Sequence, residues 1–90
     1  MSANTSPEQI AVIRGILLRS IRSFSAGLTA ETLRITLGAS GYTLPIEEVR
    51  DHLLYLEATG YVVARENKLM SGLKSYVLTG SGHIEVERAL

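Results

Sequence analysis

Two histidine–carboxylate pairs are the residues in this sequence that come closest to a metal site. Glu48 and His52 are four residues apart, and so are His83 and Glu87, so each pair would share one face of a helix. Zinc needs three or four nitrogen, sulfur or oxygen ligands, and the chain has no cysteine. We therefore interpret both pairs as exposed carboxylate–imidazole contacts, and we expect neither a metal site nor a cofactor.

The glycine-rich run Gly80-Ser81-Gly82 has the composition of a phosphate-binding turn. It lacks the lysine of a P-loop and follows no long strand–helix unit, so we interpret it as a helix start. No serine has an evident base and orienting partner for nucleophilic catalysis. A chain of 90 residues also buries only about 60 to 65% of its unfolded surface, which leaves little room for a substrate cavity. We expect a protein that is not an enzyme.

Basic side chains form blocks within a chain whose formal net charge is zero. Residues 1–44 and 61–80 each carry a net charge of +2, residues 45–60 carry −3 and the last ten carry −1. Arg65, Lys68 and Lys74 surround one loop and could contact phosphates. The alternative is that these charges solvate an exposed hairpin and protect its edges from association.

Three helices must precede that loop. Ser6 followed by Pro7 begins the first, which should run to about Ser23, and Thr29 can cap a second, short helix. Thr43 and Pro45 open a third helix, which ends at Gly60. Helical spacing predicts the following core-facing residues: Ile10, Ile13, Leu17, Ile21 and Phe24 in the first helix, Leu33 and Leu37 in the second, and Ile46, Val49, Leu53 and Leu56 in the third.

The pattern then changes to two β-prone runs, residues 61–65 and 75–79, which predict one hairpin with Tyr61 and Val63 toward the core. Thr79 can cap a last helix through about Ala89, with apolar contacts from Ile84 and Val86. The expected fold is mainly α with a β-hairpin: a three-helix core, two strands and a C-terminal helix. We expect an N-terminal tail over residues 1–7 and a single domain over residues 8–90.

The run LLYLEATGYV at residues 53–62 matches the pattern L-x-x-L-E-x-x-G-[LY]-[VI], and Leu78, Thr79 and Gly82 match L-T-x-x-G. With this element order, the chain resembles the winged form of the helix-turn-helix, similar to bacterial regulators of the MarR, PadR and ArsR type. Small winged-helix proteins of Mu-like phages, which have a similar length and element order, look closer still. The resemblance covers about residues 8–90.

The resemblance implies a small transcriptional regulator that binds double-stranded DNA sequence-specifically. The third helix would lie in the major groove and the hairpin, or wing, would contact the backbone. It implies groove contacts by Arg50 and Tyr55, and phosphate contacts by the following four residues: Thr43, Arg65, Lys68 and Lys74.

Acidic residues on the third helix depart from the pattern of that family. Glu47, Glu48 and Asp51 should face away from the core, where phosphates would repel them. The alternative function is therefore a winged-helix protein–protein interaction module, whose acidic third helix binds a basic protein partner without DNA.

Val12, Ile16 and Leu18 lie outside the core-facing stripe of the first helix and could form a homodimer interface. The basic edge beside them suits a membrane surface less well, because the helix lacks aromatic anchors. No apolar run approaches the roughly 18 residues that span a bilayer, and the start of the chain lacks a basic signal region. Together with the absence of cysteine, these features predict a cytoplasmic protein without membrane contacts.

Overall fold

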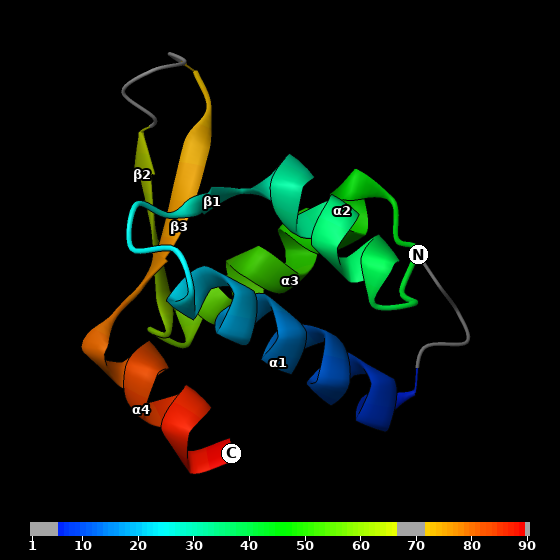
Figure 1. Ribbon diagram of the computed structural model, residues 1–90, viewed down its shortest axis with the longest axis horizontal. Coiled ribbons are helices and arrows are strands. Elements are labelled where there is room, and N and C mark those ends of the chain that lie inside the picture. Colours follow the sequence, from blue (N-terminus) through cyan, green and yellow to red (C-terminus); the bar gives the residue numbers. More distant parts are fainter. Residues whose placement is uncertain (1–5, 67–71, 90) are drawn as a thin grey trace.

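The computed structural model describes residues 6–66 and 72–89, and its helices and strands follow the predicted order with one added strand (Figure 1). Its elements are α1 (Pro7–Arg22), β1 (Leu28–Thr29), α2 (Ala30–Ala39), α3 (Ile46–Ala58), β2 (Val62–Glu66), β3 (Lys74–Leu78) and α4 (Gly80–Ala89). The chain is mostly helical, as predicted. Its sheet has three antiparallel strands in the order β1-β3-β2, where we predicted two strands.

The first two helices begin at the predicted caps. The Ser6 hydroxyl accepts a hydrogen bond from the Gln9 amide at 3.2 Å, and the Gln9 side chain accepts one from the Ser6 amide at 3.1 Å. Together they form a complete capping box, with Pro7 at the first helical position. Thr29 caps α2 by accepting from the Thr32 amide at 3.3 Å. Both predictions are confirmed, because a cap depends only on neighbouring residues.

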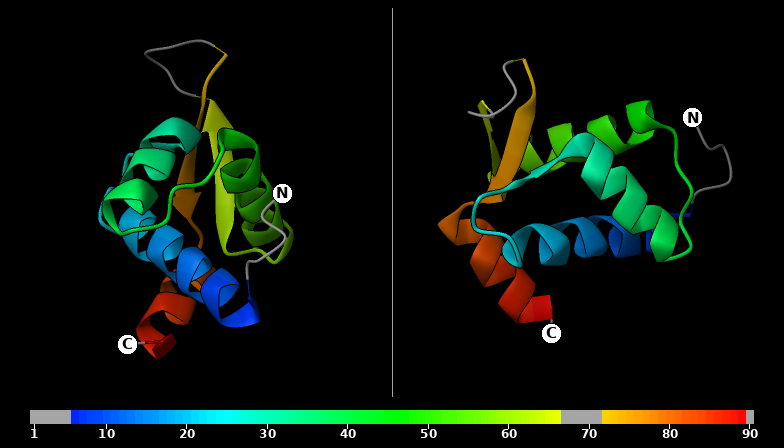
Figure 2. Two further views of the ribbon diagram at one scale, coloured as in Figure 1. Left: turned by 90° about the vertical axis from the view of Figure 1, so that its right-hand side faces the viewer. Right: turned by 45° about the horizontal axis from the view of Figure 1, so that its top comes forward.

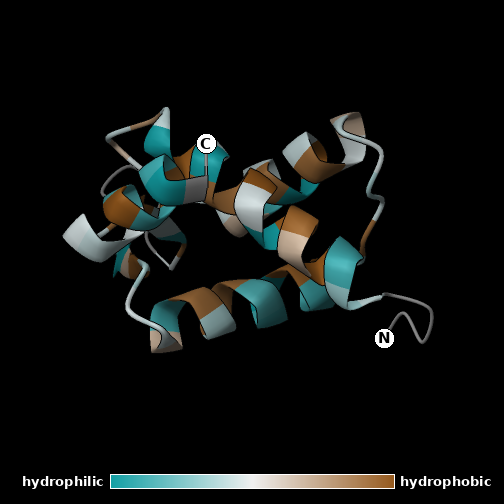
Figure 3. Ribbon diagram, turned by 90° about the horizontal axis from the view of Figure 1, so that it is seen from below, coloured by the Kyte–Doolittle hydropathy of each residue, from teal (hydrophilic) through white to brown (hydrophobic). Residues whose placement is uncertain are grey.

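The core lies between α1, α2 and α3 and the inner side of the sheet, and apolar and polar residues occupy different sides of the helices (Figure 3). Most of the predicted core positions are buried: Ile13, Leu17, Ile21, Leu33, Leu37, Val49, Leu53 and Leu56. Phe24 was predicted wrongly, since it follows the end of α1 and is 55% exposed. Leu18 was also predicted wrongly, since it is only 6% exposed and belongs to the core.

Strand β1 was missed because two residues, Leu28 and Thr29, carry no readable periodicity. They pair with Tyr76 and Ser75 of β3, so the strand exists only through its partner. This pairing joins the start of α2 to the middle of β3, and Figure 1 shows β1 running from the hairpin directly into α2. The start of α2 is therefore held at a fixed place beside the hairpin.

Val63 faces away from the core, opposite to the prediction, whereas Tyr61 packs against the core as predicted. Val62 is buried at 2% exposure, whereas Val63 is 38% exposed. Tyr61 still belongs to the turn after α3, because its amide donates to the Leu56 carbonyl at 2.9 Å. Gly60 closes α3 with a φ of 85°, as predicted for a left-handed turn. The strand therefore begins at Val62, and because Tyr61 lies in the turn before it, the inward side chain of Tyr61 does not set which strand residues face the core.

Helix α4 packs against the end of α3 through its first turn. The Thr79 hydroxyl donates to the Gly60 carbonyl and accepts from the Gly82 amide, which caps α4 as predicted. Gly82 touches Tyr61 so closely that an added Cβ would overlap the Tyr61 carbonyl. Val86 is buried as expected, but Ile84 is 60% exposed, which corrects its predicted role in the core.

The views in Figure 2 show the arrangement that positions a possible binding surface. The hairpin of β2 and β3 projects away from the helices at one side, while α4 lies at the end away from the hairpin tip (Figures 1 and 2). Helices α2 and α3 both lie beside the hairpin and pack against each other, and α4 lies on the side away from the hairpin tip.

Candidate nucleic-acid interface

A surface groove of about 370 Å³ lies between α3, residues 72–76 of the hairpin and the start of α2. Arg50 and Leu54 line it from α3, and Lys74 and Tyr76 line it from β3. The pairing of β1 with β3 brings Thr29 and Glu31 to its edge. The groove thus combines one helix face, one strand and one helix start, and it includes the third helix and the hairpin, the two elements that the winged-helix resemblance implies for DNA.

Arg50 and Lys74 are both exposed cations that line this groove, and the charge of Arg50 affects the ionisation of two groups beside it. Burial raises the pKa of Tyr76, and the Glu57 carboxylate adds to that increase, while Arg50 opposes it. Arg50 also contributes a minor part to the lowered pKa of Glu31. The charge of Arg50 is therefore felt on both sides of the groove, at Tyr76 of β3 and at Glu31 of α2.

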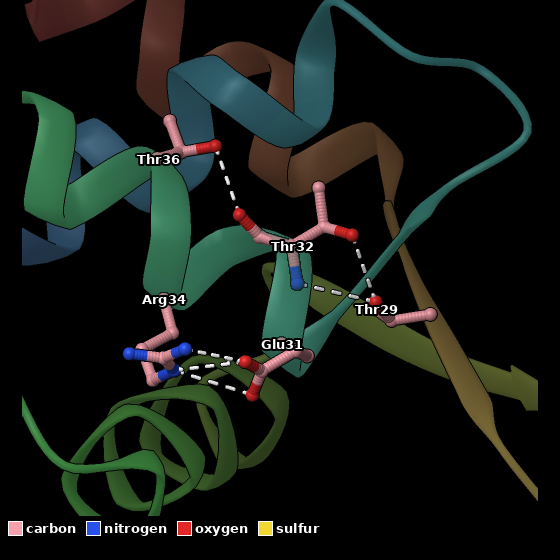
Figure 4. Close-up of polar contacts among 5 residues, drawn as sticks. All are labelled: Thr29, Glu31, Thr32, Arg34 and Thr36. Carbon is pink, nitrogen blue, oxygen red and sulfur yellow. Dashed lines mark hydrogen bonds and ion pairs between the residues drawn. The ribbon is translucent and has the colours of Figure 1, made fainter.

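The start of α2 carries a local network of hydroxyls and one ion pair (Figure 4). The Thr29 hydroxyl donates to the Thr32 hydroxyl at 3.0 Å, and the Thr36 hydroxyl donates to the Thr32 carbonyl at 3.0 Å. Arg34 donates hydrogen bonds to both carboxylate oxygens of Glu31, and this contact is the main cause of the lowered pKa of Glu31. Because the pair is exposed, its contribution to stability is small, but it offsets the charge that Arg34 would offer to a phosphate.

The hairpin cations that we predicted to act together lie on opposite faces. Lys74 pairs with Glu66, and Arg65 pairs with Ser75, in adjacent rungs of the ladder. Because successive residues of a strand face opposite sides, only Lys74 shares the face of Tyr76 and the groove. Arg65 is exposed on the other face. Lys68 lies outside the described residues.

The two residues predicted to enter a DNA groove also lie apart. Arg50 lines the groove described above, whereas Tyr55 lines a second cavity of about 360 Å³ formed by α1, α3 and α4. The guanidinium of Arg14 lies 3.5 Å from the centre of the Tyr55 ring, a cation–π contact. Tyr55 is thus engaged by α1 and does not line the groove with Arg50.

Arg14 also donates from Nε to Nδ1 of His52 at 3.2 Å. Burial lowers the pKa of His52, and the charge of Arg14 lowers it further, against the opposing effect of Glu48 and Asp51. A neutral imidazole is the form that can accept this hydrogen bond. His52 therefore links α3 to α1. The sequence analysis missed this role, because it interpreted His52 as half of an exposed pair with Glu48.

The acidic start of α3 has a structural explanation. Pro45 is the N-cap residue and makes no side-chain cap, and Thr43 is exposed in the preceding loop. Glu47 and Glu48 lie in the first turn, where carboxylates interact favourably with the positive end of the helix dipole. Part of the negative charge of residues 45–60 thus stabilises a helix start that lacks a side-chain cap.

The predicted dimer surface on α1 is smaller than expected. Val12 is exposed, and Ile16 is half-buried against the core. Leu18 is buried within the chain, because the cavity between α1, α3 and α4 places it beside Leu56 and Val86. Of the three predicted residues, Leu18 cannot offer a free apolar surface to a second copy.

Within residues 6–66 and 72–89, no cluster of three or more histidine, cysteine or acidic side chains could hold a metal ion. In the same part of the chain, no helix combines the length and apolar character needed to cross a bilayer.

Solved structures share this fold, although no protein-family model and no curated protein matches the sequence. A mutant of S. aureus MepR has a TM-score of 0.74 and 21% identity, over 84% of this chain and 53% of the MepR chain. A Streptococcus transcriptional regulator has a TM-score of 0.76 and 19% identity, over 92% of this chain and 82% of that chain. Streptococcus pneumoniae FabT, solved in complex with DNA, has a TM-score of 0.68 and 16% identity, over 96% of this chain and 52% of the FabT chain.

The chain therefore spans about half the length of MepR and of FabT. MepR and FabT are winged-helix transcriptional regulators of the MarR family, and the likeness to these structures shows that this chain has a winged helix-turn-helix fold. That confirms the predicted fold class.

Proposed function

We propose that this protein binds double-stranded DNA sequence-specifically and regulates transcription. The observation that carries the proposal is the groove in which Arg50 of α3, Lys74 of β3 and the capped start of α2 converge. A structural neighbour, FabT, was solved in complex with DNA. In the proposed mode α3 enters the major groove and the hairpin lies along the backbone.

Each group has a defined task in this mode. Arg50 offers the forked donor that reads the guanine O6 and N7 edge, and Lys74 contacts a phosphate. Arg65 contacts a phosphate with the opposite face of the hairpin, and Thr43 contacts one from the loop before α3. Tyr55 remains with Arg14 on the far side of α3.

The affinity should be modest, because cations near the groove are accompanied by carboxylates. Glu66 faces Lys74 across the ladder, and Glu31 is bonded to Arg34. A titration of a labelled random-sequence duplex at low salt, followed by fluorescence anisotropy, tests the proposal. Saturable binding that weakens with salt is expected, and an absence of binding to any duplex refutes it.

A charge-neutralising variant sharpens this test. Glu47→Gln with Asp51→Asn removes two exposed negative charges from the outward side of α3 and should strengthen duplex binding. Arg50→Ala should weaken it. If neutralisation leaves duplex binding unchanged and instead abolishes capture of a basic protein partner, then α3 is the surface of a protein interaction module.

We also propose that the chain acts as a homodimer, because a two-fold symmetric protein reads two half-sites about 34 Å apart. Sedimentation at several concentrations measures this directly. Val12 and Ile16 remain the proposed contacts on α1. Two predictions from the sequence are untested: the similarity to small winged-helix proteins of Mu-like phages, and the cytoplasmic location.

A further inference from the structure

Leu54 is a large apolar side chain held in solvent on the helix proposed to enter DNA. It is 62% exposed, although its neighbour Leu53 in the same helix is completely buried. It follows Arg50 by one helical turn, and both residues line the groove beside the hairpin. Leu73 and Tyr76 add apolar surface to the same groove. If α3 enters the major groove as proposed, a leucine at this position meets the base edges, where its side chain can make only apolar contacts.

The polar groups around Leu54 restrict what this face of α3 can read. Glu47 and Asp51 lie seven and three residues before it, so they share the same outward stripe, and both are exposed. Ionised carboxylates only accept hydrogen bonds, so in the major groove they can pair with the N4 amino group of cytosine or the N6 amino group of adenine but not with the acceptor edge of guanine. Among the residues of this stripe and its edge, Arg50 is the donor that suits a purine. The contact left for Leu54 is apolar.

The apolar group in the major groove of DNA is the C5-methyl of thymine. We propose that Leu54 is a specificity-determining residue that contacts a thymine methyl group within the site read by α3. This inference rests on the proposed DNA-binding function. Charge on the groove supports DNA as the occupant, because Arg50 and Lys74 line it and the carboxylate that also lines it, Glu31, is bonded to Arg34.

The test compares two duplex polymers that differ only in that methyl group: alternating poly(dA-dT) and alternating poly(dA-dU), of equal length and charge. Burying one methyl group should strengthen binding about fourfold for each thymine contacted. The wild-type chain should therefore bind the thymine polymer several-fold more tightly. Leu54→Ala should reduce the ratio of the two affinities to about one, with both polymers still bound.

Ile84→Ala is the matched control. Ile84 is 60% exposed, nearly the same as Leu54, and lies on α4, away from the hairpin. This variant should keep the wild-type ratio, and thermal unfolding of both variants should match that of the wild type because neither residue belongs to the core.

A second pair of polymers, poly(dG-dC) with and without the cytosine C5-methyl, separates thymine from 5-methylcytosine as the source of the methyl group. A preference confined to the thymine pair, or present in both pairs, supports the proposal. A preference for methylated cytosine alone overturns it.

The remaining outcomes also decide whether Leu54 contacts a thymine methyl group. Equal binding of the dT and dU polymers by the wild type overturns the role of Leu54 but leaves the DNA-binding function standing. A thymine preference that persists in Leu54→Ala shows that another residue or the shape of the duplex is responsible. If the wild type binds no polymer at low salt, the proposed function itself fails.

Discussion

Replacing Gly82 with alanine should destabilise the protein strongly, although alanine is the better helix former. Gly82 lies in the first turn of α4, where an added Cβ would stand 3.1 Å from the Leu78 side chain and closer than 3.0 Å to the Tyr61 carbonyl oxygen. The Leu78 methyl can move, but the carbonyl belongs to the backbone turn that joins α3 to β2. Relief therefore requires α4 to shift away from that turn.

Such overpacking against backbone costs about 3 kcal/mol, the upper part of the usual range. For a domain of this size that corresponds to a decrease in Tm of roughly 12 to 24 °C. The shift would also strain the hydrogen bond from the Thr79 amide to the Tyr61 carbonyl, which measures 3.0 Å.

Gly80→Ala is the matched control, two residues earlier in the same helix. No atom lies within 4 Å of its added Cβ, and its φ is negative. Alanine should therefore stabilise the protein by about 0.4 to 1 kcal/mol, because it restricts the unfolded chain. Thermal and urea unfolding followed by circular dichroism measures both variants. Equal effects of the two substitutions would refute the proposed packing of α4 against the Tyr61 turn.

Three further predictions concern other parts of the molecule. Lys74→Ala should weaken duplex binding for all sequences and reduce the slope of log affinity against log salt by about 0.9, which titrations at several salt concentrations measure; an unchanged slope would place Lys74 away from the phosphates. Thr29→Ala removes the cap of α2 and should cost about 1 kcal/mol in urea unfolding, whereas no loss would mean that the pairing of β1 holds the helix start by itself. The pKa of His52 in the folded chain lies below its ordinary value of 6.5, so its contribution to stability is complete above that pH and is lost as the pH falls through the folded pKa. His52→Gln can still accept the hydrogen bond from Arg14 but does not titrate, so it should flatten this dependence. Unfolding measured between pH 5 and pH 8, the range in which histidines change charge, tests this; an identical pH profile would contradict it.

The candidate site shows which functional features could be predicted. Arg50 and Lys74 were both proposed from the sequence, and the structure brings them into one groove. Arg65 was grouped with Lys74 because the two residues flank one loop, but strand alternation places them on opposite faces. The helical pattern indicates that Leu54 is exposed, because the core-facing positions of α3 beside it are Leu53 and Leu56. Its place in a groove depends on the hairpin and α2.

The sequence by itself determined the features that depend on near neighbours. The caps at Ser6, Thr29 and Thr79, the end of α3 at Gly60 and the helical spacing of the core residues are all local, because hydrogen bonds and side-chain faces repeat over three or four residues.

Tertiary structure decided the features that depend on a distant partner. Strand β1 exists because β3 pairs with it, Leu18 is buried because α4 and α3 cover that side of α1, and Tyr55 faces Arg14 because α1 lies beside α3. Each requires segments that are far apart in the chain to meet, and a periodic pattern specifies which face of an element is apolar without specifying which element covers it.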